Sequence, residues 1–135
     1  MSEKQRRRQE VSLIVEAVYR GNAREVQRLL EAGGNVNWVS PDGWPLLHYA
    51  VMGGDSEIVK LLLDSGADID ARAADGVTPL INAIEWGYIE IVRILLSYGA
   101  DSGAKDAYGR TALKIATEHS SGRIMALLNT AGPRS

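Results

Sequence analysis

The chain has 135 residues, a net charge of −2 and no cysteine. Its length suits a single domain, and its content of 45% apolar and 24% charged residues is typical of a globular rather than a disordered chain. The lack of cysteine excludes disulfides, thiolate nucleophiles and cysteine metal sites.

Neither a membrane span nor a secretory signal is expected. No apolar run approaches the roughly 18 residues that a membrane-spanning helix needs. The opening stretch MSEKQRRRQE has no apolar segment after its basic residues. Together with the lack of cysteine, which fits a reducing compartment, these features predict a cytoplasmic protein.

A basic arm opens the chain. Lys4, Arg6, Arg7 and Arg8 lie within the first ten residues, whereas acidic residues outnumber basic ones in the remainder. An acidic body argues against broad nucleic-acid binding, which depends on neutralising phosphates. We therefore expect residues 1–9 to form a solvated helix start or a disordered tail, with contact to a nucleic acid or another anionic surface as the alternative.

The rest of the chain has a period of 33 residues, which indicates a repeat protein. Glycine and aliphatic positions share this period: Gly43, Gly76 and Gly109; Gly33, Gly66, Gly99 and Gly132; Leu29, Leu62, Leu95 and Leu128; Val26, Val59, Val92 and Met125. The period divides residues 10–132 into four copies, at about 10–39, 40–72, 73–105 and 106–132. We expect residues 133–135 to be a frayed tail.

The first copy differs from those that follow. It has Glu10 where later copies have the turn glycine, and its second predicted helix carries Arg24 and Arg28 among other polar residues. Because an open stack exposes its end faces to water, we expect this copy to be a cap.

The third copy shows the repeating unit most clearly, in the stretch DGVTPLINAIEWG. Gly76 permits a tight turn, Thr78 is placed to cap a helix, and Pro79 suits its first position. Gly87 ends this helix, and IEIVRILLSYG predicts a second helix that stops at Gly99. A unit of turn, helix, connection, helix and loop cannot bury its apolar stripe alone, so it must stack on its neighbours. In the last copy, polar residues interrupt the stripe within TEHSSGRIMALLNTAG, which again predicts a cap.

The sequence contains no pattern typical of catalysis. Its two histidines, His48 and His119, do not have metal-ligand spacing. The acidic stretch SGADIDARAAD lacks the spacing of a calcium loop, and no glycine-rich stretch is followed by the Lys-Ser/Thr of a phosphate loop. We therefore expect neither an enzyme nor a bound metal or cofactor.

The stretches DGVTPLINAIEWGYIEIVRILLSYGAD and DGWPLLHYAVMGGDSEIVKLLLDSGADID resemble the ankyrin repeat, over about residues 10–132. Thr78, Pro79 and Leu80 match the family's Thr-Pro-Leu-His, with Ile81 in place of the histidine, and His48 stands at that position in the preceding copy. The Gly-Ala-Asp loops at 66–68 and 99–101 match fully. The resemblance implies an all-α solenoid of stacked helix-turn-helix units with β-turn fingers, in which His48 hydrogen-bonds to neighbouring turn backbone.

The resemblance also implies a concave groove, lined by the turn tips and the first helices, that binds other proteins. Carried over position by position, it predicts partner contacts at Tyr19, Arg20, Trp38, Asp42, Trp44, Met52, Arg72, Asp75, Val77, Glu85, Trp86, Lys105, Tyr108, Arg110, Glu118 and His119. These residues combine aromatic side chains with charges of both signs, which suits a protein partner better than a phosphate or a lipid.

The three tryptophans all map to this predicted groove or its turns, and none falls on the stacking stripe. Large aromatic residues are enriched at binding hot spots. We expect partner contact from Trp44 and Trp86, with intramolecular cover as the alternative for both. Trp38 serves equally well as a lid over the edge of the first copy or as part of the contact surface.

The sequence thus predicts a protein-interaction module that acts as a regulator, inhibitor or scaffold, either as a monomer or in a partner-dependent complex, without a small-molecule substrate. One alternative is an engineered binder or self-assembling subunit, although the divergent copies PLLHYAVMGGD and TPLINAIEWGY favour a natural origin or a natural scaffold. The other is a binder of nucleic acid or anionic surfaces through residues 1–9. Salt-dependent binding that disappears when these residues are deleted would favour it.

Overall fold

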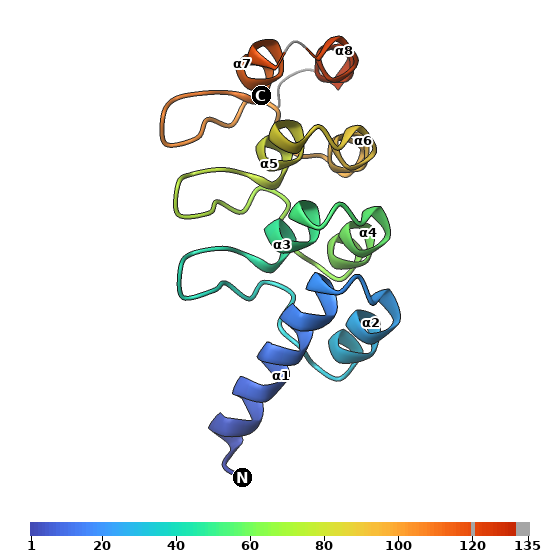
Figure 1. Cartoon of the computed structure of the whole chain (residues 1–135), viewed down its shortest axis with the longest axis vertical. Coiled ribbons are helices and arrows are strands. Elements are labelled where there is room, and N and C mark those ends of the chain that lie inside the picture. The colour runs from blue at the N-terminus through green and yellow to red at the C-terminus, as the bar shows by residue number, and fades with distance from the viewer. Residues whose placement is uncertain (120, 132–135) are drawn as a thin grey trace.

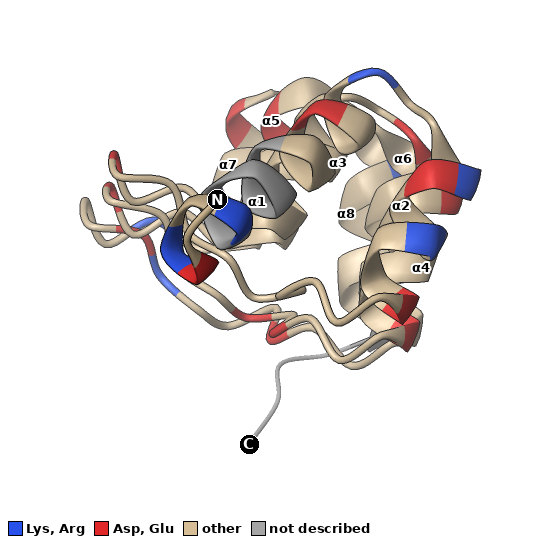
Figure 2. Cartoon of the chain, turned by 90° about the horizontal axis from the view of Figure 1, so that it is seen from below, with Lys and Arg blue, Asp and Glu red and all other residues tan. Residues whose placement is uncertain are grey.

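The computed structural model describes residues 1–119 and 121–131, with the side chains of all of these except 7–12 and 131. Eight helices are present in this part of the chain: α1 (Glu3–Tyr19), α2 (Ala23–Glu31), α3 (Leu46–Met52), α4 (Ser56–Asp64), α5 (Pro79–Trp86), α6 (Ile89–Ser97), α7 (Ala112–Glu118) and α8 (Gly122–Ala131). They form four pairs stacked in one row (Figure 1). The inner helices α1, α3, α5 and α7 lie on one side of this row and the outer helices α2, α4, α6 and α8 on the other (Figure 2). The predicted all-α solenoid is confirmed.

Three loops project from the row as fingers, at residues 39–45, 72–78 and 105–111 (Figure 1). Each is closed by a backbone hydrogen bond at the same register: Ser40 to Trp44 at 2.9 Å, Ala73 to Val77 at 3.0 Å and Asp106 to Arg110 at 2.9 Å. Gly76 is needed at its tip for two reasons. Its φ is +79°, and a Cβ there would lie 2.6 Å from the backbone nitrogen of Ala107 in the next finger.

The boundaries of α5 follow from the residues that predicted them. The Thr78 hydroxyl accepts a hydrogen bond from the Ile81 N–H at 3.3 Å, and Pro79 occupies the first turn. Gly87 ends the helix in the left-handed conformation, with φ at 72°.

The first repeat begins with a long helix. Helix α1 runs without a break from Glu3 to Tyr19, so no element boundary separates residues 1–9 from the rest. Ser2 and Gln5 cap each other at its start: the Gln5 N–H donates to the Ser2 Oγ at 3.1 Å, and the Ser2 N–H donates to the Gln5 Oε1 at 2.9 Å. The arm is therefore a helix start and not a disordered tail, and Glu10 lies within a helix where later repeats have a finger. The tail at 133–135 lies outside the described residues.

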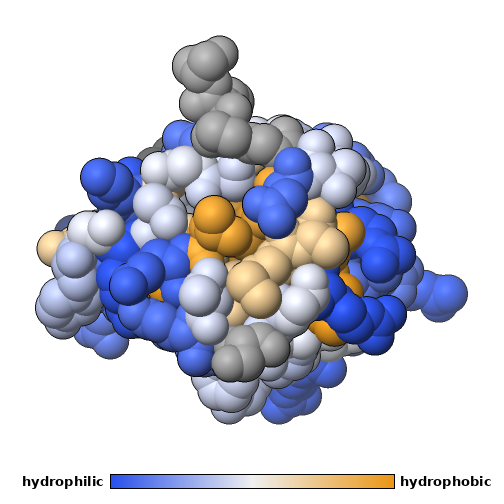
Figure 3. All heavy atoms as spheres, turned by 90° about the horizontal axis from the view of Figure 1, so that it is seen from above, coloured by the Kyte–Doolittle hydropathy of each residue, from blue (hydrophilic) through white to orange (hydrophobic). Residues whose placement is uncertain are grey.

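The core is the apolar stripe that each pair buries against the next. Leu62 and Leu95 are fully buried and Ile91 is 2% exposed. In the last repeat of the described residues, Leu113 is 44% exposed although its counterpart Leu80 is 1% exposed. Apolar atoms accordingly appear in the middle of that end of the stack (Figure 3).

Polar side chains also link successive repeats. The Asn37 Oδ1 accepts a hydrogen bond from the Asp68 N–H at 2.7 Å, and the Asn37 Nδ2 donates to the Gly66 carbonyl at 3.1 Å. One repeat later, the Asp70 Oδ1 accepts from the Asp101 N–H at 2.9 Å. The corresponding position in the next repeat is Gly103, which has no side chain to continue this series of hydrogen bonds.

His48 makes a further link, as predicted for a residue at its position. Its Nε2 lies 2.7 Å from the Val77 carbonyl oxygen in the next finger. Because a carbonyl can only accept, Nε2 carries the proton. Burial lowers the pKa of His48, and the hydrogen bond to Val77 and the charge of Asp75 oppose this only in part.

Replacing Leu95 by alanine should lower the free energy of unfolding by about 2–5 kcal/mol, because it opens a cavity in a fully buried stripe. Urea denaturation measures this change. Leu113→Ala is the matched control, and its loss should be below about 1 kcal/mol because Leu113 is partly exposed at an end face. Equal losses in the two variants would contradict the assigned stacking register.

His48→Ala should lower stability by about 1–2 kcal/mol at pH 7.5, because the Val77 carbonyl loses its buried partner. The folded state holds the pKa of His48 below that of the unfolded chain, so the unfolded state binds more protons as the pH falls below about 6.5. The His48 contribution is therefore complete above that pH and lost as the pH falls. Urea midpoints at pH 7.5 and 5.5 should differ more for the wild type than for His48→Ala.

Candidate functional site: the finger–helix face

The ends of the inner helices place predicted contact residues at one repeating position. Tyr19, Met52, Glu85 and Glu118 are 33 residues apart, and each is followed by a residue that caps or ends the helix. Tyr19 is 80% exposed and Trp86 is 57% exposed, whereas Met52 is half-buried. Together with the three fingers, these helix ends form what we call the finger–helix face. Figure 2 shows the fingers and the inner helices along the stack.

Arg110 is the centre of a charged cluster on the last finger. Its Nε and Nη2 each lie 2.9 Å from the Asp106 Oδ2, and its Nη1 lies 3.9 Å from the Glu118 Oε2. The guanidinium also lies over the Tyr108 ring, 5.6 Å from the centroid, which is cation–π distance. Three of the predicted residues are thus brought together: Tyr108, Arg110 and Glu118.

Asp106 holds this cluster in place from inside the finger. Its side chain is fully buried, and its Oδ1 accepts from the N–H groups of Tyr108 and Arg110, both at 2.9 Å. Burial alone would raise the pKa of this carboxyl, but these hydrogen bonds and the Arg110 guanidinium hold it below its ordinary value. The carboxylate therefore stays charged and fixes the direction of Arg110.

Glu85 faces the same cluster from the preceding repeat. Partial desolvation raises the pKa of Glu85; Arg110 and His119 oppose that rise, whereas Asp75 and Asp106 add to it. Asp75, Arg110 and His119 therefore each lie within electrostatic reach of Glu85. The face between the third and fourth repeats carries charges of both signs.

The second finger is also tied to the third. The Arg72 guanidinium donates to the Gly76 carbonyl at 3.2 Å and to the Lys105 carbonyl. The Asp75 Oδ1 accepts from the Val77 N–H at 3.2 Å. The Arg72 side chain thus joins the two fingers through the backbone carbonyl of Lys105, whose own side chain is exposed.

Trp86 lies on an aromatic partner that the sequence analysis did not identify. Its ring stacks on that of Tyr88, with centroids 6.2 Å apart and an interplanar angle of 11°. Tyr88 in turn donates from its hydroxyl to the Met52 carbonyl at 3.4 Å and packs over Gly54, where an added Cβ would lie 3.2 Å from the ring. Trp86 is therefore held on a fixed platform while more than half of it remains exposed.

The other two tryptophans are half-buried and have intramolecular partners. The Trp38 ring centroid lies 6.1 Å from that of Tyr49, another residue that the sequence analysis did not single out. Trp44 meets His48 edge to face at 5.8 Å. The ring contacts of Tyr49 and Tyr88 depend on how neighbouring helices and turns are placed relative to one another. In the sequence, their only sign is an aromatic residue beside a helix end or a turn.

The predicted partner contact of Val77 is wrong. This residue was predicted to contact a partner, but it is 5% exposed and belongs to the hydrophobic core. The physical reason is its small apolar side chain, which packs inward. Trp44 and Arg110, at the equivalent positions of the other two fingers, remain half-exposed.

The remaining predicted residues are at the surface. Arg20, at the end of α1, pairs with Glu16 at 2.6 Å. Asp42 is exposed on the first finger, and His119 is exposed at the end of α7.

Among residues 1–119 and 121–131, no three His, Cys, Asp or Glu side chains are grouped so as to hold a metal ion. Asp106 and Glu118 pair with Arg110, and Glu118 also lies 3.9 Å from the Lys114 Nζ. In the same part of the chain, no helix is both long and apolar enough to cross a membrane. The arrangement is suited to contacts through aromatic faces and charge pairs.

Comparison with known proteins agrees with this architecture. The family described as "Ankyrin repeats (3 copies)" matches residues 14–106 and again residues 72–133. No curated protein matches the chain. The two family matches together cover most of the sequence, and the chain belongs to the ankyrin repeat family.

Proposed function

We propose that this chain is a protein-interaction module that binds a protein partner through the finger–helix face, as a cytoplasmic regulator, inhibitor or scaffold. Ankyrin repeats generally mediate protein–protein interaction and are typically not enzymes. The observation that carries the proposal is Trp86, 57% exposed and held on Tyr88. A large aromatic side chain that is ordered before binding loses little conformational freedom when a partner covers it.

The charges around Trp86 support a protein as the partner. Glu85 and Glu118 provide acidic groups, and Arg110 provides a basic group already oriented by Asp106. Such oriented, partly desolvated charges favour partners with complementary side chains and select the register of the contact. An apolar anchor with a charged rim is the usual composition of a protein interface.

The two alternative functions differ in where binding would occur. Binding of a nucleic acid or an anionic surface would depend on the basic start of α1, where Lys4 and Arg6 are exposed. It would be strongly salt-dependent and insensitive to Trp86. A self-assembling subunit would bind a second copy of the chain, so that the protein would change its oligomeric state with concentration.

Trp86→Ala should weaken partner binding by about 2 kcal/mol or more, the threshold of a hot spot, and leave the melting temperature nearly unchanged. The partner is isolated by affinity capture with the wild-type chain, and its dissociation constant is then measured for each variant. Tyr98→Ala, which removes an exposed aromatic residue from the outer helices, is the control and should retain binding. Loss of folding stability with unchanged affinity would instead identify Trp86 as a lid on the stack.

Lowering the pH should weaken binding if Glu85 contacts a basic group of the partner. The pKa of Glu85 is raised, so its charge is lost at a higher pH than for an ordinary glutamate. Dissociation constants at pH 7 and pH 5 should therefore differ more for the wild type than for Glu85→Gln. Equal pH dependence in the two proteins would assign the effect to another group.

A further inference from the structure

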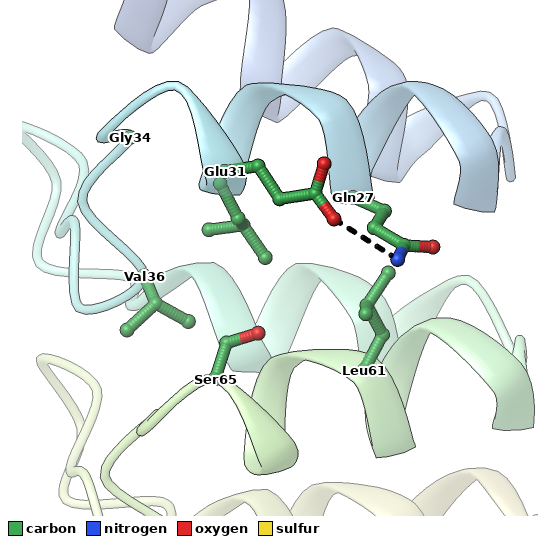
Figure 4. A pocket seen from close by; sticks show the side chains of 7 residues that line it. Gln27, Glu31, Gly34, Val36, Leu61 and Ser65 are labelled. Carbon is green, nitrogen blue, oxygen red and sulfur yellow. Dashed lines mark hydrogen bonds between the residues drawn. The ribbon is translucent and has the colours of Figure 1, made fainter.

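A pocket of about 250 Å³ lies between the outer helices of the first two repeats (Figure 4). Its apolar lining comes from Leu30, Val36 and Leu61, and its polar lining from Gln27, Glu31 and Ser65. The outer helices lie on the opposite side of the row from the inner helices, so this pocket is separate from the finger–helix face (Figure 1).

The next gap along the stack shows what fits this shape. Positions 33 residues after Glu31 and Ser65 are occupied by Asp64 and Tyr98. Tyr98 follows α6 and reaches across to the end of α4, where its hydroxyl donates to the Asp64 Oδ1 at 2.8 Å. The hydrogen bond to Asp64 raises the pKa of Tyr98, as expected when a phenol donates to a carboxylate. Tyr98 is 41% exposed, and its phenol bridges the ends of α6 and α4 across this gap.

The gap between α2 and α4 has a carboxylate acceptor but no tyrosine ring. Glu31 occupies the position of Asp64, but Ser65 replaces Tyr98 and is too short to cross from α4 to α2. The Glu31 carboxylate accepts from the Gln27 Nε2 at 3.2 Å, above the space lined by Val36, Leu61 and Ser65 (Figure 4). Because a carboxylate has about four acceptor sites, this bond leaves room for an added hydroxyl donor.

The size of the pocket limits its occupant. Sites for drug-sized ligands and cofactors usually measure about 300–1,000 Å³, so a pocket of 250 Å³ suits a single side chain better. Among side chains, only tyrosine combines a flat apolar body with a phenolic hydroxyl at its far end. We propose that the pocket between α2 and α4 is a docking site for a tyrosine side chain presented by a protein partner, in the way that Tyr98 occupies the next gap. This inference does not depend on the finger–helix face.

The test uses the whole chain and a blocked Gly-Tyr-Gly peptide, titrated over the millimolar range expected for so small a ligand. Chemical shifts in ¹⁵N and methyl NMR spectra should saturate at Leu30, Val36, Leu61 and Ser65. The matching Gly-Phe-Gly peptide should bind about five-fold more weakly, the usual effect of one net hydrogen bond. Equal affinity for the two peptides, or shifts elsewhere on the chain, would refute the site.

Variants give an independent readout. Ser65→Tyr should fill the pocket with the chain's own ring, abolish peptide binding and preserve or raise the melting temperature. Glu31→Ala changes an exposed residue and should remove the preference for tyrosine over phenylalanine, so it tests the proposal even if Ser65→Tyr does not fold. Tyr98→Ser should open the second gap and add a second set of shifts at Leu63, Ile69 and Ile94. Unchanged tyrosine preference in Glu31→Ala would overturn the proposal.

The free phenol p-cresol separates a protein partner from a small molecule. A tyrosine within a peptide should bind at least as well as p-cresol, because in the next gap the ring of Tyr98 reaches across from the end of α6 with its backbone attached. Saturable binding of p-cresol without binding of the peptide would overturn the assignment to a protein partner. Trp86→Ala should leave peptide binding unchanged, which distinguishes failure of this inference from failure of the proposed function.

Discussion

The structure depends on the burial of each repeat's apolar stripe by the repeat beside it. A pair of short helices has no interior of its own, so the stability of the stack comes from the interfaces between pairs. Leu62 and Leu95 are fully buried for this reason, whereas Leu113, in the last described repeat, is 44% exposed. The hydrophobic contribution is proportional to area and has no preferred direction. It holds the pairs together without fixing how they are aligned.

Alignment comes from polar groups that reach forward by one repeat. His48 contacts the Val77 carbonyl, Asn37 contacts the loop at Asp68, and Asp70 contacts the N–H of Asp101. Each bond requires one register, and for His48 and Asp70 a slip would leave a buried or partly buried polar group without its partner. The fingers add a direct backbone link, from the Ala107 N–H to the Asp75 carbonyl at 3.0 Å. The rigid face that carries Trp86 and Arg110 is a consequence of this alignment.

Sequence reasoning succeeded where one residue type determines one conformation. Thr78, Pro79 and Gly87 mark the ends of a helix through local geometry, and the period of 33 residues implies stacking. It failed where the outcome depends on neighbours. The sequence left open whether residues 1–9 are a helix start or a disordered tail, and Val77 was expected at the surface because contact positions of the ankyrin family were carried over to it. The Trp86–Tyr88 stack depends on the left-handed conformation of Gly87, which lies between these two residues in the chain. The sequence locates this glycine but does not define how the two rings are oriented.

The differences between copies are therefore more informative about binding than their similarities. Because the stack sets the backbone at each register, a change at an exposed position alters chemistry without altering the fold. Position 86 holds tryptophan where neighbouring repeats hold Gly53 and His119, and position 65 holds serine where the next repeat holds Tyr98. The first difference adds a large apolar surface to one face, and the second removes an aromatic ring from the other. Tyr98 bridges one gap between outer helices, whereas Ser65 leaves the preceding gap open. The chain therefore contains both the proposed site and an example of the side chain proposed to bind there. Since both gaps are built on the same backbone, the Ser65→Tyr and Tyr98→Ser variants exchange their roles and test side-chain chemistry alone.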